Sequence, residues 1–344
     1  MSQETLLVVG GAGYIGSHCT TLLLEHGYNA LVLDDLSTGH REAVPEEASL
    51  IIGDLGDAAL LNNIFERHDI SAVFHFAALA IVSESPRQPL TYYENNVAKT
   101  AVLLQAMASH EVPCFIFSST AAVYGEPSAD VLTEDHPTSP VNPYGRSKLM
   151  VEAMLSDAAE ALALRYASLR YFNAAGTDPS GRWGEDHRPE THLIPRILLG
   201  TLAHQGVAIH PAADVPPWIE VYGTDYDTPD GTCVRDFIHV TDLAEAHLLA
   251  LRHLRQEGES LVCNLGSETG FSVRQVIEAA ARVTGTSLPV QEKPRRPNEP
   301  SRLVASAAFS RRLLGWNPRF SDLETIIQTS WEWHKAHPRG YAQS

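Results

Sequence analysis

Cysteine is scarce in this sequence, and the cysteines that are present are isolated from one another. Only four occur among 344 residues, and no two form a C-x-x-C pattern. Scattered thiols of this kind are typical of proteins from a reducing compartment and argue against a disulfide framework. They are Cys19, Cys114, Cys233 and Cys263. Histidine is more frequent, but its 16 residues include no H-x-x-x-H pattern and no Cys/His cluster, so we expect no metal site.

Positive charge and long hydrophobic runs are also scarce. The formal net charge is −17, whereas nucleic acids and anionic membranes bind basic surfaces. No run approaches the ~18 apolar residues of a membrane span. The N-terminal sequence "MSQETLLVVGG" has no basic stretch before its apolar residues. We therefore expect a cytoplasmic protein with no nucleic-acid or membrane partner, in which any anionic ligand is met by local arginines.

Short apolar runs alternate with helical patterns through the first half of the chain. Apolar content is 44% and charged content 19%, as in ordinary globular proteins. Alternation of strands and helices predicts an α/β fold with a doubly wound parallel sheet covered on both sides. The expected strands are residues 6–9, 30–34, 72–76, 115–118 and 167–171, and the expected helices include residues 15–26, 60–67 and 93–109.

The composition changes after the last of these strands. Residues 173–234 are rich in Gly, Pro, Asp and Trp, with one helical pattern at 193–204. A strand–helix signal returns at 236–253, then a strand at 261–265 and a helix at 272–284. We predict a Rossmann-type domain at 1–175 with a return segment near 235–265. A smaller α/β substrate domain, discontinuous in sequence, would occupy 176–344.

Three glycines, Gly10, Gly13 and Gly16, lie between the first strand and the first helix. Such glycines let the backbone turn tightly and approach a pyrophosphate at the helix N-terminus, although a plain tight turn has the same composition. Asp34 ends the next strand 18 residues after Gly16, near the ~20 expected of an acid that binds the adenosine ribose. That acid would repel a 2′-phosphate, and no arginine follows before Arg41, which favours NAD over NADP.

A second acidic position follows the next apolar run. Asp54, in "GDL", is placed to accept a hydrogen bond from the adenine amino group, or else to cap the helix that follows.

Tyr144 and Lys148 stand four residues apart in "NPYGRSK", a spacing that places both on one helix face. A phenol has a pKa of ~10, and lowering it by three units toward the working pH of a general base takes ~4 kcal/mol. A neighbouring ammonium and the positive nicotinamide of NAD⁺ would supply that stabilisation. Taken alone the pair would be surface decoration; after a dinucleotide fingerprint it indicates proton and hydride transfer.

Together these features resemble the extended branch of the short-chain dehydrogenase/reductase superfamily, and within it the UDP-glucose 4-epimerase family. The matching segments run in order along nearly the whole chain: "GGAGYIGSH", "HFAALA", "YYENNV", "SSTAAVYG", "PYGRSK", "RYFNAAG", "PETHLIP", "DGTCVRDFIHVTDLA" and the Arg295–Arg296 loop. The resemblance implies Tyr144 as the base, Thr120 as its hydroxyl partner and Lys148 on the nicotinamide ribose. It also implies a homodimer.

The same resemblance implies further binding residues. At NAD it adds Tyr14, Ile15, Asp35, Ser37, Thr38, Gly39, Leu55, Phe76, Ala77, Ala78, Asn95 and Phe172. At a UDP-sugar it adds Asn173, Leu193, Val221, Tyr222, Arg235, Arg296 and Glu299 beside Thr120. Instead of binding the diphosphate, Arg235 could form an ion pair with Asp236 or another neighbour. The Arg295–Arg296 pair could instead belong to a solvated loop.

Two alanines favour one reaction over another. Dehydratases of this branch resemble "STDEVYG", with an acidic pair where this chain has Ala121 and Ala122. Alanine transfers no proton, so hydride transfer alone remains, which implies epimerisation at C4 of a UDP-hexose through a 4-keto sugar. A 4-epimerase of UDP-xylose, UDP-glucuronate or UDP-N-acetylglucosamine, a 4,6-dehydratase and a silent NAD-binding sensor are the alternatives.

Four positions depart from the usual pattern of the family. Ala80 replaces a lysine near the cofactor phosphates, Asn298–Glu299 replaces Gly-Asp, and His192 stands where an asparagine is found. Leu303 is smaller than the tyrosine of some members, which would leave room for a 2-acetamido sugar. The 207–217 segment is longer than usual.

Overall fold

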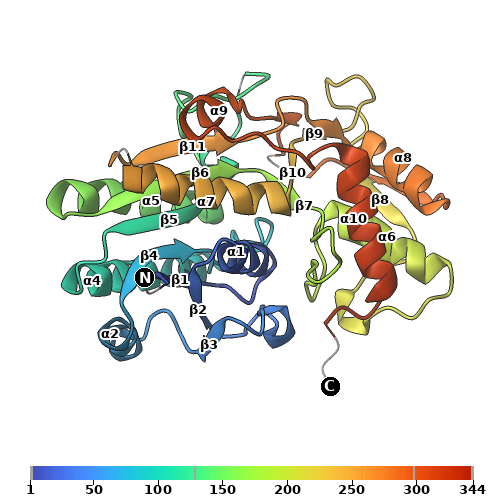
Figure 1. Cartoon of the computed structure of the whole chain (residues 1–344). Coiled ribbons are helices and arrows are strands. Elements are labelled where there is room, and N and C mark those ends of the chain that lie inside the picture. The colour runs from blue at the N-terminus through green and yellow to red at the C-terminus, as the bar shows by residue number, and fades with distance from the viewer. Residues whose placement is uncertain (1–2, 128, 257, 297–298, 342–344) are drawn as a thin grey trace.

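A seven-stranded parallel sheet forms the centre of the computed structural model, which describes residues 3–127, 129–256, 258–296 and 299–341 (Figure 1). Its strands alternate with helices along the chain, as the apolar runs predict. They are β1 (Thr5–Val9), β2 (Asn29–Asp34), β3 (Ser49–Ile52), β4 (Ile70–His75), β5 (Cys114–Thr120), β6 (Arg165–Tyr171) and β11 (Leu261–Leu265).

The strand order in the sheet is β11-β6-β5-β4-β1-β2-β3, so the direction of winding reverses between β1 and β4. Every pairing is parallel, with Val9 opposite Leu33 on one side and opposite His75 on the other. This is the doubly wound Rossmann arrangement, in which ligands bind beyond the carboxyl ends of the strands at the point of reversal.

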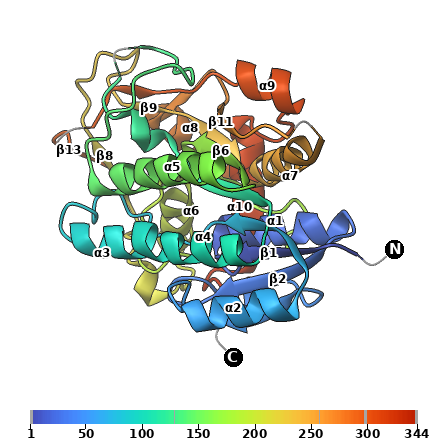
Figure 2. The same ribbon diagram turned by 90° about the vertical axis from the view of Figure 1, so that its left-hand side faces the viewer.

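Helices cover both faces of the sheet. On one face α1 (Tyr14–Glu25), α7 (Val240–Gln256) and α9 (Ala308–Leu314) pack on a core that includes Leu23 and Leu251. On the other, α2 (Ala58–Arg67), α4 (Lys99–Ser109) and α5 (Pro143–Ala161) pack on a core that includes Phe115 and Leu155. Figure 2 shows α5 and α4 side by side on this second face. Strands buried on both sides explain why the apolar runs are continuous rather than alternating.

A third apolar cluster lies beside the sheet, on the right in Figure 1. Its helices are α6 (Leu193–His204), α8 (Val273–Thr284) and α10 (Leu323–Ala336). Short strands accompany them in three small sheets: β7 (Asn173–Ala175) with β10 (Phe237–His239), β8 (Ile219–Tyr222) with β13 (Val290–Lys293), and β9 (Val234–Arg235) with β12 (Phe271–Ser272) and β14 (Arg302–Leu303). The remaining one-turn segments are Arg41–Ala43, Ala121–Tyr124 and Pro211–Ala213.

The expected helix at 93–109 differs in detail. Helix α3 (Pro89–Tyr93) precedes it and runs into a π-helical turn at Glu94–Ala98 before α4 begins. The earlier start has a local cause, because Pro89 occupies the first helical turn, where a missing N–H costs nothing. The sequence analysis also overlooked α9 and α10. None of the described helices combines the length and the hydropathy that a membrane crossing requires.

Candidate active site

The predicted cofactor residues gather at the carboxyl edge of the sheet. They lie at or just after the ends of the parallel strands: Gly10, Gly13, Tyr14, Ile15 and Gly16 after β1; Asp34, Asp35, Ser37, Thr38 and Gly39 at β2; Asp54 and Leu55 after β3; Phe76, Ala77 and Ala78 after β4; and Phe172 after β6. Helical segments bring in the rest, because Asn95 lies in the π-helical turn and Tyr144 and Lys148 lie in α5.

The glycine turn is a tight backbone crossing. Gly10 has φ of +81°, and a Cβ there would lie 2.4 Å from the Ala77 backbone nitrogen. A Cβ on Gly16 would lie 2.1 Å from the Gly10 carbonyl oxygen. Gly13 is different, because its Cβ would meet only that oxygen, at an ordinary 3.4 Å. Gly13 is also the N-cap of α1 and makes no side-chain cap, so the helix N-terminus is left to bind an anion.

Asp34 is held against this turn. One carboxylate oxygen accepts a hydrogen bond from Ala12 N and the other from Leu36 N, both at 2.9 Å. Burial raises the pKa of Asp34, and these two backbone hydrogen bonds oppose the shift. The next residues are also pinned to the turn, because His40 N donates to the Ala12 carbonyl at 2.9 Å. The acid is thus oriented by the glycine turn and stays close to it.

Asp54 is not a helix cap. The N-cap of α2 is Asp57, which accepts hydrogen bonds from Ala59 N and Leu60 N. Asp54 is half-exposed and forms an ion pair with Lys99 at 2.7 Å. That hydrogen-bonded partner is the main reason why the pKa of Asp54 is lowered. The capping alternative for Asp54 is therefore wrong, and the carboxylate stays ionised at the edge of the sheet.

The tyrosine and lysine project from the first turns of α5. Asn142 caps this helix by accepting from Gly145 N at 2.8 Å, and Pro143 follows at its first position. The Lys148 ammonium is buried, donates to the Ser118 carbonyl at 2.8 Å and lies 4.8 Å from the centre of the Phe117 ring. Both contacts come from β5, the strand that ends in Thr120. The cap and the strand together fix where the lysine points.

The electrostatics of the pair are set by burial. Burial raises the pKa of Tyr144, and a hydrogen bond with Thr120 is the opposing influence. Burial lowers the pKa of Lys148 to about 7, against a smaller raising effect of Glu152. The Thr120 hydroxyl is thus the group that opposes the raised pKa of Tyr144 in this structure, and the lowering expected from Lys148 stays a prediction.

Two arginines predicted at a diphosphate lie in separate small groups. Arg235 forms an ion pair with Glu299 at 3.1 Å, whereas Asp236 accepts from the backbone of Ser267 and Ala305 instead. The neighbouring Asn173 donates to the Asp236 carbonyl at 2.8 Å. The ion pair considered as the alternative for Arg235 is thus present, with Glu299 as its partner.

The second group surrounds the strand β8. The Arg296 guanidinium lies 4.1 Å from the centre of the Tyr222 ring, while the Tyr222 hydroxyl donates to Glu220 at 2.7 Å. Val221 is buried. Leu193 is the first residue of α6 and packs at the border of the third apolar cluster, which lies beside the central sheet. Arg295 pairs with Asp225 at 2.7 Å, and both Arg295 and Arg296 are exposed, as the solvated-loop alternative supposes. Asn298 lies outside the described residues.

Comparison with known proteins decides what this arrangement belongs to. The model of the NAD dependent epimerase/dehydratase family matches residues 6–266. This chain belongs to that family. It is 48% identical over 337 residues to the UDP-glucose 4-epimerase of Halalkalibacterium halodurans, covering 98% of this chain and 97% of that protein. The crystal structure of UDP-glucose 4-epimerase from Brucella ovis in complex with NAD superposes with a TM-score of 0.90 at 47% identity, covering 96% and 98% of the two chains.

A third similar protein carries both ligands that bear on the site. The UDP-glucose 4-epimerase of Bifidobacterium longum in complex with NAD⁺ and UDP superposes with a TM-score of 0.89 at 37% identity. The match covers 98% of this chain and all of that one, at 100%. The cofactor of the epimerase/dehydratase family is NAD, and the uncapped α1 N-terminus beside the side-chain-free Gly13 fits its pyrophosphate.

One positioning residue escaped the sequence analysis. Asn96, buried in the π-helical turn, accepts from Leu79 N at 2.9 Å and donates to the Leu79 carbonyl at 3.0 Å and to Ser147 Oγ at 3.1 Å. It therefore joins the loop after β4 to α5. The only sign of this role in the sequence is the doubled asparagine in "YYENNV". The hydrogen-bond partners of a buried amide are supplied by the folded chain and cannot be read from the sequence.

Proposed function

We propose that this chain interconverts UDP-glucose and UDP-galactose by inverting C4 of the hexose, with NAD as a retained cofactor. The observation that supports this most directly is the Tyr144–Thr120–Lys148 group. It stands at the same sheet edge as the glycine turn, in a chain 48% identical to a UDP-glucose 4-epimerase. The group is suited to moving one proton at a site where a hydride also moves.

The protein residues have a defined part in each half-reaction. Bound NAD would supply hydride transfer to and from C4. Tyr144 holds the proton that leaves O4, and Thr120, hydrogen-bonded to the phenol, holds O4 and relays that proton. Lys148 is fixed by the Ser118 carbonyl and orients the nicotinamide ribose. Proton and hydride return to the opposite face after the 4-keto sugar turns.

The residues beside Thr120 limit the chemistry to epimerisation. Ala121 and Ala122 form the one-turn helix that follows β5, and neither side chain carries a proton. Elimination of water needs an acid and a base at these positions. A 4,6-dehydratase is therefore disfavoured.

The UDP moiety is held by the two arginine groups. Arg235 and Arg296 neutralise the diphosphate, Tyr222 lies against the uracil, and Glu299 contacts the uridine ribose while remaining paired with Arg235. Asn173, Leu193 and Val221 complete the wall of the site. A firm hold on UDP with few contacts to the sugar lets the ketone rotate, because tight binding of one pose would stop turnover.

Leu303 favours a wider substrate range. It pairs with Arg235 across β14 and β9 and packs beside the cluster of Ala121, Val123, Tyr124 and Leu132. A leucine at the sugar pocket leaves space that a tyrosine would fill. UDP-N-acetylglucosamine is the second candidate substrate, and absence of its turnover would remove it.

Three further proposals accompany the activity. The chain divides into an NAD-binding domain at 1–175, completed by a return near 235–265, and a nucleotide-sugar domain at 176–344. It works as a homodimer in the cytoplasm. Light scattering on the protein eluted from a size-exclusion column gives its molar mass and so tests the dimer. The mass of a single chain would contradict it.

The reaction itself is tested without added cofactor. Purified protein incubated with UDP-glucose should yield UDP-galactose, detected by the anomeric proton signals in NMR, because NAD regenerates in each cycle. Parallel incubations with UDP-xylose, UDP-glucuronate and UDP-N-acetylglucosamine rank the alternatives. A sugar-nucleotide product lighter by about 18 mass units, the mass of one water molecule, would instead identify a dehydratase, because general acid–base elimination removes water. Stoichiometric NADH with release of an oxidised sugar would identify a dehydrogenase.

Removal of the phenol hydroxyl isolates the base. Tyr144→Phe should lower kcat by roughly 10²–10⁴-fold, the usual contribution of a positioned proton-transfer group. NAD content, read from the absorbance of the denatured supernatant, should be unchanged. Tyr28→Phe, at a half-buried tyrosine outside the site, is the matched control and should retain full activity. Full activity of Tyr144→Phe would remove Tyr144 from the mechanism.

A further inference from the structure

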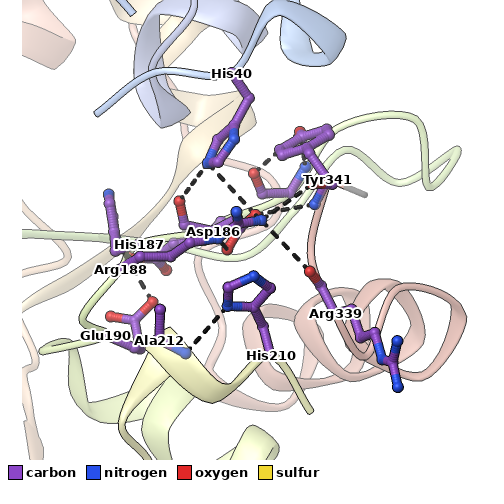
Figure 3. Close-up of polar contacts among 11 residues, drawn as sticks. His40, Asp186, His187, Arg188, Glu190, His210, Ala212, Arg339 and Tyr341 are labelled. Atoms are coloured by element: carbon purple, nitrogen blue, oxygen red, sulfur yellow. Dashed lines mark hydrogen bonds and ion pairs between the residues drawn. The ribbon is translucent and has the colours of Figure 1, made fainter. Parts of the chain in front are cut away.

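A second cluster of reactive groups borders the proposed epimerase site and has no part in the proposed reaction. Glu185, His187, Glu190 and His192 fall within eight residues of sequence, and one oxygen or nitrogen of each lies within 4.8 Å of the others. Both glutamates are buried, with 3% and 1% exposure. Figure 3 shows His187 and Glu190 facing one another beside Asp186. Carboxylate and imidazole groups in this proportion are the ligands of a divalent transition metal.

The separations fit a single central ion. His187 Nδ1 lies 3.2 Å from a Glu185 oxygen and 3.5 Å from Glu190 Oε2. His192 Nδ1 contacts the same Glu185 oxygen. Four ligands at about 2.0–2.2 Å around tetrahedral zinc stand roughly 3.4 Å apart. Two of these separations are therefore close to the spacing that one zinc ion imposes, and all four groups lie within 4.8 Å of one another.

Two atoms in the cluster have ion-pair contacts but no hydrogen bond among the described residues. Glu190 Oε2 and His187 Nδ1 are both buried, and neither makes a hydrogen bond within the described part of the chain. The Glu190 side chain is otherwise fixed, because its Oε1 accepts from His192 N at 2.8 Å. Buried polar atoms almost always have partners. Glu185, His187 and Glu190 also line a small cavity of about 10 Å³.

The charge of the cluster points the same way. In the described residues, the ion-pair partners of Glu185 and Glu190 are His187 and His192, with no lysine or arginine among them. Arg188 pairs with Asp186, and Arg196 donates to the Glu190 carbonyl rather than to its carboxylate. Two protonated imidazoles, with ring centres 5.1 Å apart, would also balance the carboxylates, and this ion-pair network is the alternative to a metal ion. One divalent ion balances both carboxylates with neutral rings.

We propose that Glu185, His187, Glu190 and His192 form a structural zinc site, each giving one ligand atom to a tetrahedral Zn²⁺. Four protein ligands leave no open position for a substrate or a water nucleophile, so the ion is structural rather than catalytic. The ion binds the deprotonated carboxylates and the neutral imidazoles, and no covalent bond of the protein is made or broken.

The position of the site indicates what the ion fastens together. The His187 ring stands edge-on to the Tyr14 ring, 6.4 Å between centres, and Tyr14 follows the glycine turn. The adjacent Asp186 contacts His40 at 3.4 Å and accepts from Tyr341 N at 2.9 Å (Figure 3). Zinc would therefore hold segment 185–192 rigid between the cofactor turn and the C-terminal segment.

The test is direct measurement of the metal. Untagged full-length protein, grown with zinc and purified without chelator, should carry one zinc per chain by inductively coupled plasma mass spectrometry. The double variant His187→Asn, Glu190→Gln should carry at least about tenfold less zinc, as expected when ligation is lost. His210→Asn is the matched control. His210 lines the same cavity but binds Ala212 N, and this variant should keep its zinc.

Two further measurements keep the result independent of folding defects. A chelator should lower the unfolding temperature of the wild type and of His210→Asn but leave that of the double variant unchanged. In crystals of the wild type, an anomalous difference map at the zinc edge should show one peak between the four side chains. Zinc content equal in wild type and double variant, or no such peak after soaking in zinc, would overturn the proposal in favour of a protonated ion-pair network. Neither readout depends on epimerase activity.

Discussion

At the residue scale, the glycine turn contains glycines required for two different reasons. Gly16 is needed by the fold, because a Cβ would lie 2.1 Å from one backbone oxygen and 2.8 Å from the Gly11 Cα. Gly13 is not needed by the fold, since its Cβ would make one ordinary contact at 3.4 Å. The absence of a side chain at Gly13 therefore leaves space for a ligand at the α1 N-terminus.

The two glycines should respond differently to alanine. Gly13→Ala should lower the free energy of unfolding by about 1 kcal/mol or less, while retained NAD falls at least about tenfold, because a methyl group covers the phosphate-binding helix N-terminus. Gly16→Ala should cost about 3 kcal/mol or more, because backbone atoms must move. Urea unfolding and cofactor content of the purified variants measure both effects. Full NAD retention in Gly13→Ala would show that the pyrophosphate does not bind at the α1 N-terminus beside Gly13.

At the scale of the element, α7 carries a buried neutral histidine. His247 is fully buried, its Nδ1 binds the Leu243 carbonyl at 2.8 Å, and its ring lies 4.9 Å from that of Phe76. Burial lowers the pKa of His247 to about 4. In the unfolded chain the same ring has a pKa of ~6.5. The unfolded state therefore binds more protons between these values, and stability falls as the pH drops below 6.5.

Replacing this ring should remove part of the acid sensitivity. Between pH 7 and pH 5 the wild type should lose about 2 kcal/mol more free energy of unfolding than His247→Leu, because the variant has no ring to protonate on unfolding. Urea unfolding at the two pH values gives the difference. His26→Leu, at an exposed histidine after α1, should show no such gain. Equal pH dependence in wild type and His247→Leu would mean that this ring is charged in the folded protein.

At the scale of the whole molecule, Asp242 joins distant parts of the chain. This buried carboxylate at the start of α7 accepts from Arg319 N and Phe320 N at 2.9 Å and from Ser321 Oγ at 2.7 Å. The Asp242 carbonyl also accepts from the Trp316 indole at 2.9 Å. A helix that covers the central sheet is thereby bonded to the segment that leads into α10.

An asparagine cannot replace this carboxylate. Asp242→Asn should lower the free energy of unfolding by about 3 kcal/mol, because its NH₂ group would face backbone N–H donors. Glu245→Gln, three residues along the same helix, removes only a partly exposed ion pair of 3.6 Å to Arg319 and should cost less than about 1 kcal/mol. Thermal unfolding compares the two. A loss for Asp242→Asn no larger than for Glu245→Gln would show that the two parts unfold independently.

How much of the site could be predicted depended on the range of the interactions involved. The glycine turn and the Tyr144–Lys148 spacing are local patterns, and the structure places them together at one edge of the sheet. The cap of α2 was assigned to Asp54 as one alternative, although the choice between Asp54 and Asp57 turns on backbone geometry. The spacing E-x-H-x-x-E-x-H at 185–192 is neither H-x-x-x-H nor a cysteine pair, so the sequence pattern alone does not predict the proposed zinc site.

By itself, the sequence determined the alternation of strands and helices, the nature of the cofactor turn and the resemblance that led to the family. These depend on near neighbours, whose spacing is visible in the chain. Only the tertiary structure decided the charge of each group. Arg235 pairs with a glutamate 64 residues away, burial lowers the pKa of Lys148, and four side chains of one short segment come within 4.8 Å of one another. The physical reason is that desolvation and pairing arise from groups brought together by folding, whatever their distance along the chain.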